Sequence, residues 1–198
     1  DRQAVKFWQV FGSFWWAVGC LGMAEHYRNG PDQSVERPGI GRRSSECQID
    51  CVNLLIPGPL TLVGPQASTG LVDMPRSDEL LTSVIDFLRQ QVMTETSGRT
   101  RFLARVASNS LDIVQRELAL GEAAAHHERS GIQALLKTQE EDLIKLRWQL
   151  VHGLRDGRIA LDAAGLAAHL RGYVANQINI DQPRYPGLAT ALRGGMGV

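Results

Sequence analysis

Residues 101–121 read RFLARVASNSLDIVQRELALG, and this stretch decides the fold class. Its apolar residues recur at intervals of three and four, which places them on one face of an α-helix. The stretch closes with Gly121, a residue type favoured in the position just after a helix. It therefore predicts an amphipathic helix that packs one side on a core and ends at Gly121. The apolar positions are Phe102, Leu103, Val106, Ala107, Leu111, Val114 and Leu118.

The same helical period continues on both sides of this stretch. Ser77, followed by two acidic residues, has the character of a helix N-cap. Further helical patterns cover residues 122–136, residues 140–156 and the segment from Asp162 to just before Pro183. No alternating stretch is long enough to predict a strand. The connections are short, so we predict an all-α fold with an up-and-down bundle of about five helices.

Residues 7–24 are almost continuously apolar. Trp8, Trp15 and Trp16 lie off the regular apolar stripe, so the predicted helix is apolar on nearly all sides. Its length approaches the about 20 residues of a membrane span. Polar residues and three glycines interrupt it, however. We therefore expect a helix buried against packing partners and no membrane segment.

A change of composition separates two parts of the chain. A second helix is predicted over residues 40–55 and ends before Pro57. The stretch that follows, IPGPLTLVGP over residues 56–65, is rich in helix breakers and carries no charge. We therefore predict a linker over residues 56–73, which joins a helical tail over residues 1–55 to a helical domain over residues 74–198.

The overall composition limits the classes of function. The chain has 198 residues, and its 21 basic and 21 acidic side chains give a formal net charge of zero. Nucleic-acid binding normally requires a basic excess, so no nucleic-acid partner is expected. The three cysteines, Cys20, Cys47 and Cys51, are an odd number without a secretory signal. This favours a reducing cytoplasmic location and buried thiols over a disulfide framework.

The N-terminal segment resembles a known family. The matching residues are KFWQVFGS at 6–13, Cys20-Leu21, Ser34-Val35-Glu36 and IGRR at 40–43. They resemble the C-terminal helices of aminoglycoside-phosphotransferase-like kinases, in the branch that accompanies acyl-CoA dehydrogenases. The resemblance implies a kinase-like phosphotransferase lobe as a partner of this segment, and an association with an acyl-CoA dehydrogenase.

The segment after Met74 is similar to a bacterial helical domain of unknown function that is encoded beside those kinases and dehydrogenases. The residues that carry this similarity are Arg99, RFLARVA at 101–107, Asn109, Arg116-Glu117-Leu118, Gly121 and DQPRY at 181–185. The similarity implies a role near the activation and oxidation of acyl thioesters. It implies no reaction for the domain itself.

The chain lacks the parts that a kinase needs for phosphoryl transfer. The only resemblance to a His-Gly-Asp catalytic loop is VHGLRDG at 151–157, where Leu154 replaces the aspartate. A helix end capped by glycine is the preferred interpretation. Glu122 and His126 are one helical turn apart but typical of a solvated face, and His169 lies among apolar positions. We predict no catalytic residues, no metal site and no cofactor.

One polar row could bind an anion. Arg101, Arg105 and Asn109 follow one another at single helical turns, and Arg99 lies beside them. Guanidinium groups can hold a phosphate or a carboxylate through two parallel hydrogen bonds. The four residues are therefore candidate anion-binding residues, for the head of an acyl-CoA or an acidic partner surface. In the alternative interpretation, these arginines and Arg116 pair with Asp112, Glu117 and the region of Asp181.

The sequence favours a non-catalytic helical accessory or scaffold region of a phosphotransferase-like protein associated with acyl-CoA catabolism. The alternative is an enzyme that binds an acyl-CoA or another phosphate-bearing ligand between its helices. An exposed aromatic helix would drive association. We therefore expect Trp8, Trp15 and Trp16 to form a partner surface and the chain to self-associate through it.

Overall fold

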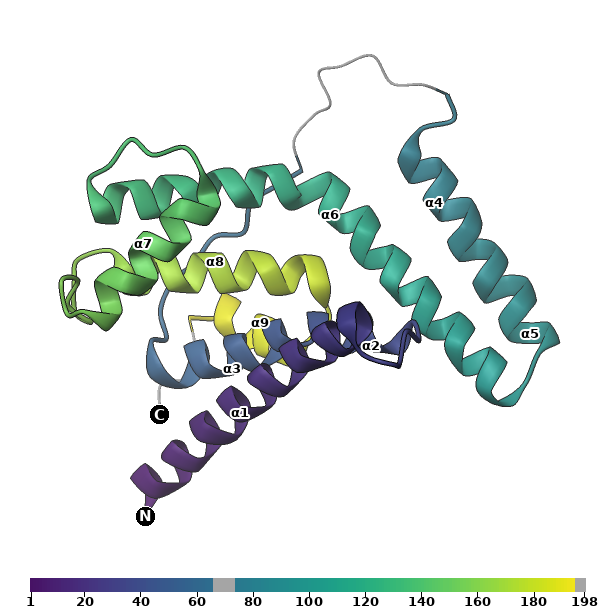
Figure 1. Ribbon diagram of the computed structural model, residues 1–198, viewed down its shortest axis with the longest axis horizontal. Coiled ribbons are helices and arrows are strands. Elements are labelled where there is room, and N and C mark those ends of the chain that lie inside the picture. Colours follow the sequence, from purple (N-terminus) through teal and green to yellow (C-terminus); the bar gives the residue numbers. More distant parts are fainter. Residues whose placement is uncertain (66–73, 195–198) are drawn as a thin grey trace.

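The computed structural model describes residues 1–65 and 74–194, which form helices with no strand among them (Figure 1). The predicted all-α fold is confirmed for this part of the chain. The elements are α1 (Arg2–Asn29), α2 (Glu36–Arg42), α3 (Ser44–Leu55), α4 (Ser77–Asp86), the π-helical turn η1 (Phe87–Val92), α5 (Met93–Glu95), α6 (Gly98–Leu136), α7 (Leu143–Arg155), α8 (Leu166–Asp181) and α9 (Pro186–Leu192).

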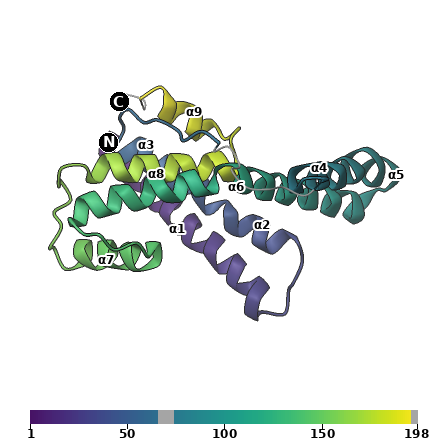
Figure 2. The same cartoon turned by 90° about the horizontal axis from the view of Figure 1, so that it is seen from above.

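The 39-residue helix α6 is the longest of the described helices. Its first half pairs with α4, η1 and α5 in an arm that projects from the rest of the chain, and its second half packs against α7 and α8 (Figures 1 and 2). The prediction that the helix ends at Gly121 is wrong, because Gly121 lies inside α6. A glycine inside a helix costs only about 1 kcal/mol, which packing on both sides of it outweighs. The helix ends at Lys137, whose φ of 53° breaks the hydrogen-bond ladder.

Several other helix boundaries differ from the sequence prediction. The segment predicted as one helix over residues 40–55 forms α2 and α3, with Arg43 between them. Pro38 lies in the first turn of α2, where its missing N–H is not needed. Ser77 is the first residue of α4, and the N–H of the preceding Arg76 donates to the Glu79 carboxylate at 2.8 Å. Helix α9 was not predicted from the sequence.

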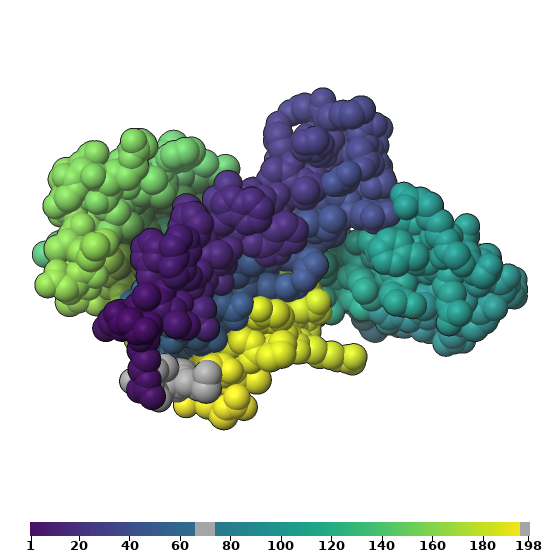
Figure 3. Space-filling view, turned by 90° about the horizontal axis from the view of Figure 1, so that it is seen from below, coloured from purple at the N-terminus to yellow at the C-terminus, as the bar shows by residue number. Residues whose placement is uncertain are grey.

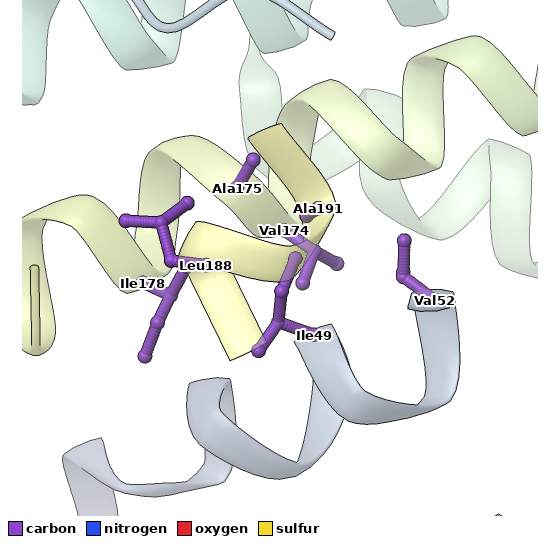
Figure 4. Packing of buried hydrophobic residues seen from close by; sticks show 7 residues of the cluster. All are labelled: Ile49, Val52, Val174, Ala175, Ile178, Leu188 and Ala191. Carbon is purple, nitrogen blue, oxygen red and sulfur yellow. The ribbon is translucent and has the colours of Figure 1, made fainter. Parts of the chain in front are cut away.

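The main hydrophobic core joins segments from both ends of the sequence. Helix α3 packs against α8 and α9, and the side chains that meet there are buried (Figure 4). The predicted helical tail over residues 1–55 and the predicted helical domain over residues 74–198 therefore both contribute to one core. The buried residues are Ile49, Val52, Val174, Ala175, Ile178, Leu188 and Ala191.

A second core lies at the opposite end of α8. It is built from α6, α7 and the start of α8, and its buried members are Ile132, Leu146, Leu150 and Leu166. Helix α7 is attached to α6 by a salt bridge as well. Arg147 donates two hydrogen bonds of 2.6 Å to the buried Glu128 carboxylate. These contacts fix α7 at the side of α6, away from the arm.

The described part of the predicted linker is packed on α8. The N–H of Val63 donates to the Asn176 side-chain oxygen at 2.9 Å, and Arg171 donates to the carbonyl of Ile56 at 3.2 Å. Leu60 and Leu62 pack against the α3–α8–α9 core. Residues 56–65 therefore belong to the folded structure. The rest of the predicted linker, residues 66–73, lies outside the described residues.

Candidate functional site

A cavity of about 930 Å³ lies where α2, α3, η1 and the middle of α6 meet the turn over residues 181–184. Arginines of α2, η1, α6 and the turn line it, together with Arg43 between α2 and α3, and we name it the arginine cavity. Its charged lining residues are the five arginines Arg42, Arg43, Arg89, Arg116 and Arg184 and the four acidic residues Glu36, Glu46, Asp112 and Asp181.

Three of the five arginines are paired with carboxylates of the wall. Arg42 donates to the buried Asp181 at 2.6 Å, and it also reaches Glu117 at 3.0 Å. Arg43 bonds Glu46 one turn later on α3, at 3.1 Å. From the arm, Arg89 reaches Asp112 of α6 at 2.5 Å. These pairs connect α2 to α6 and α8 and connect η1 to α6, while the Arg43–Glu46 pair is local to the start of α3.

Arg116 is bonded differently. Its Nε donates to the carbonyl of Ile180 at 2.6 Å, and one terminal nitrogen donates to the carbonyl of Asp181 at 3.1 Å. Both carbonyls belong to the last turn of α8, where a positive charge is favourable. Burial lowers the pKa of the Arg116 guanidinium, and the nearby Arg184 lowers it further, while Asp112 opposes the shift. Arginine stays protonated even so, so the cavity retains this charge.

The remaining arginine, Arg184, is exposed at the rim of the cavity. Among the described residues it has no carboxylate within salt-bridge distance. Arg116 and Arg184 thus form a positive end of the cavity that no direct ion pair neutralises.

The predicted row of anion-binding residues does not form one site. Asn109 lines the cavity, and Arg99 lies 3.1 Å from Glu36 at its edge. Arg101 and Arg105 are exposed on a part of α6 outside the lining. Residues at single-turn spacing drift around a straight helix, so Asn109 faces the cavity whereas Arg101 and Arg105 do not.

The alternative interpretation of these arginines agrees with the structure in part. Arg116 does contact the region of Asp181, as that interpretation requires. Asp112 and Glu117 pair instead with Arg89 and Arg42, which are outside the row. No sequence pattern relates these two arginines to their partners, which lie 23 and 75 positions away along the chain.

The second candidate surface is one side of α1. Trp8 and Trp15 are 64% and 65% exposed, and Trp16 is 37% exposed. The prediction that this helix is buried is therefore wrong for the single chain, because α2 and α3 cover only one side of it. Figure 3 shows α1, in purple, along the outer face of the molecule. We name the exposed side the α1 aromatic face, and it consists of Phe7, Trp8, Phe11, Phe14, Trp15, Trp16, Val18 and Leu21.

Three aromatic rings near the N-terminal end of this face contact one another. Phe7 and Trp8 meet edge to face with centroids 5.3 Å apart, and Trp8 and Phe11 do so at 5.7 Å. The opposite side of α1 contains the buried Cys20, which lies toward α3. Among the described helices, none combines the length and the hydropathy needed to cross a membrane.

Two of the three cysteines and one histidine, His169, are buried in the fold. Cys20 and Cys47 are buried, and burial raises the pKa of the Cys47 thiol to about 11. His169 is buried against Gly131 of α6, and burial lowers its pKa. Residues 151–157 form the end of α7, as predicted, and Gly157 has a φ of 70°. In the part of the chain that is described, no group of three or more acidic, histidine or cysteine side chains has a metal-binding arrangement.

Comparison with known proteins gives one match. Residues 94–185 match a protein family described as a domain of unknown function (DUF6285). The predicted presence of a domain of unknown function is thus confirmed for these residues. The DUF6285 region extends from α5 through α8 to the turn at residues 181–184, so it supplies Arg116, Asp181 and Arg184 of the arginine cavity. No curated protein and no solved structure matches the chain.

Proposed function

We propose that this chain is a non-catalytic helical interaction module that docks another protein surface through the α1 aromatic face. The observation that carries the proposal is the exposure of eight large apolar side chains along one helix. Burying one such side chain is worth about 1.5–3 kcal/mol. Monomeric soluble proteins rarely expose a large apolar patch, and such a patch is typical of an interaction site.

The composition of the face supports protein docking as well. Three of its members are tryptophans, the residue type most enriched among those that dominate binding energy. The Trp8 ring contacts Phe7 and Phe11 on the same helix, which limits the side-chain entropy that Trp8 loses on binding. Helix α1 lies on the outer face of the molecule that Figure 3 shows, so a partner can reach it without rearranging the core.

The first occupant we propose is a second copy of this chain. Two α1 helices can pair about a two-fold axis, with the same face on both partners. A kinase-like phosphotransferase lobe is the second candidate, and it is supported by the resemblance of residues 6–13 and 40–43 to the tail of such kinases. An association with an acyl-CoA dehydrogenase, and with acyl-CoA catabolism, rests on the same resemblance.

Sedimentation velocity tests self-association directly. We expect the wild-type chain to sediment as a dimer and the double variant Trp8→Ser/Trp15→Ser as a monomer, because the variant removes the largest exposed rings. Trp148→Ser is the matched control, since Trp148 on α7 is equally exposed and lies outside the face. The control is expected to remain dimeric. A wild-type monomer at micromolar concentration would reject self-association and leave the phosphotransferase lobe as the candidate partner.

A further inference from the structure

We propose that the arginine cavity binds a small amphiphilic anion. Its oxyanion group, a phosphate or a carboxylate, lies between Arg116 and Arg184, and its apolar part extends along α6 toward Val106. This site is independent of the α1 aromatic face, which is on another side of α2 and α3.

The charge of the cavity is concentrated at one end. Arg42, Arg43 and Arg89 are each paired with a carboxylate at 2.5–3.1 Å. Arg116 donates only to backbone carbonyls, through Nε and one terminal nitrogen. A guanidinium has five N–H donors, so the other terminal nitrogen can still bind a ligand. Together with Arg184 it offers two guanidinium groups to one oxyanion, which is the favoured arrangement for phosphate and carboxylate recognition.

The lining along α6 mixes apolar and polar side chains. Its apolar members are Phe102, Val106 and Ile113 of α6 and Ile40 of α2, and Asn109, Ser110 and Asp112 are interspersed among them. Gly39 of α2 lies next to α6 here, because a Cβ on it would lie 3.8 Å from the Val106 side chain. The apolar members can contact a hydrocarbon portion of the ligand.

The dimensions set the size of the ligand. The cavity volume of about 930 Å³ lies within the usual range of small-molecule sites. Val106 and Arg116 are ten residues apart on one helix, which is about 15 Å at the helical rise. A ligand with an anionic head and a short alkyl chain can lie along this length. The wall is already held by the Arg42–Asp181 pair, so binding requires little reorganisation.

The experiment is isothermal titration of the full chain at low ionic strength with four probes. Hexyl phosphate and octanoate carry both the head and the chain, and comparing them distinguishes a phosphate site from a carboxylate site. Inorganic phosphate lacks the chain, and hexanol lacks the charge. We expect one of the two amphiphiles to bind at least about tenfold more tightly than inorganic phosphate, and hexanol to bind more weakly than either.

Two variants and a control variant test whether the ligand binds in the arginine cavity. Arg184→Ala removes an exposed side chain that forms no ion pair with any of the described residues, and we expect it to weaken amphiphile binding about tenfold or more. Asn109→Trp fills the middle of the cavity from an exposed position and is expected to abolish binding. Arg155→Ala is the matched control, an exposed arginine at the end of α7. Its binding is expected to equal that of the wild type.

Two results would overturn the proposal. One is the absence of heat from both amphiphiles at millimolar concentration with the wild-type chain. The other is an equal loss of binding in Arg184→Ala and Arg155→Ala, because that would show general attraction to surface arginines. Circular dichroism of each variant confirms that a loss of binding is not a loss of fold.

Discussion

Two glycines of α6 have opposite surroundings. A Cβ added to Gly131 would lie 2.3 Å from Nδ1 of His169, whereas one added to Gly121 would lie 3.4 Å from the flexible side chain of Glu117. Gly131 is therefore needed for the close approach of α6 and α8. Gly121 has no comparable role in the packing.

We expect Gly131→Ala to destabilise the chain by about 1–3 kcal/mol, since overpacking forces His169 or the helices to move. Gly121→Ala should stabilise it by about 0.5–1 kcal/mol, because alanine loses less backbone entropy in a helix. Urea unfolding of the two variants against the wild type measures both changes. Equal effects of the two substitutions would show that the α6–α8 contact is looser than the structure has it.

His169 predicts a pH dependence of stability. Burial lowers its pKa in the folded chain below the ordinary 6.5, and His127 lowers it further, while Glu128 opposes the shift. Below pH 6.5 the unfolded chain therefore binds more protons at this residue than the folded chain. The stability that neutral His169 contributes is complete above pH 6.5 and is lost as the pH falls toward its folded pKa.

We therefore expect the thermal midpoint to fall between pH 7.5 and pH 5, and to fall less in His169→Gln, which cannot be protonated. The difference between the two midpoints at each pH isolates the histidine from other titrating groups. An identical pH profile for both chains would exclude His169 as the cause.

At the scale of elements, α9 shows how a short helix is kept in place. A helix of seven residues is not stable alone, so its position must come from tertiary contacts. Just before it, Tyr185 donates to the Asp50 carboxylate of α3 at 2.6 Å, and Asn53 donates to the carbonyl of Gly187 at 2.9 Å. Burial raises the pKa of Asp50, while the Tyr185 hydroxyl acts in the opposite direction.

We expect Tyr185→Phe to cost about 1–3 kcal/mol of unfolding free energy, because it leaves the half-buried Asp50 carboxylate without its donor. Tyr27→Phe is the matched control, since Tyr27 is exposed on α1 and the same chemical change should have little effect there. Chemical denaturation followed by circular dichroism compares the two. An equal loss of unfolding free energy in Tyr185→Phe and Tyr27→Phe would mean that the Tyr185–Asp50 hydrogen bond does not stabilise α9.

At the scale of the molecule, the α3–α8–α9 core makes the two ends of the chain depend on each other. Ile49 is fully buried in it, and its neighbours Val174 and Ile178 belong to α8. The independent folding of residues 74–198 stays a prediction from the sequence. The shared core leads us to expect that a chain beginning at Met74 unfolds at a much lower denaturant concentration.

We expect Ile49→Ala to cost about 2–5 kcal/mol, as for other large core residues, and Ile144→Ala on the exposed side of α7 to cost about 0.5 kcal/mol or less. Fluorescence of the α1 tryptophans and circular dichroism of the whole chain should report one shared transition. Two separate transitions, with only the first shifted by Ile49→Ala, would support a domain over residues 74–198 that folds without the N-terminal tail.

The local sequence determined the helical class and most of the helices. Periodicity depends on residues three and four positions apart, so a helix such as α7 is visible without knowledge of its neighbours. The ends of the helices were harder to predict. A glycine such as Gly121 signals a possible helix end, but the packing on both sides of it decides whether α6 continues. The wholly apolar character of residues 7–24 was also visible. The sequence could not show that only one side of that helix is covered.

The arginine cavity was decided by the tertiary structure alone. Arg42, Arg89, Arg116 and Arg184 lie on four segments that are far apart in the chain, and no spacing rule relates them. Their meeting depends on how α2 and the arm pack on α6. The row from Arg99 to Asn109 was visible in the sequence because it lies on one helix. Which side of that helix faces a neighbouring element is set by packing. The physical reason is range: hydrogen bonds along a helix are local, whereas burial and ion pairing join residues that only the complete fold brings together.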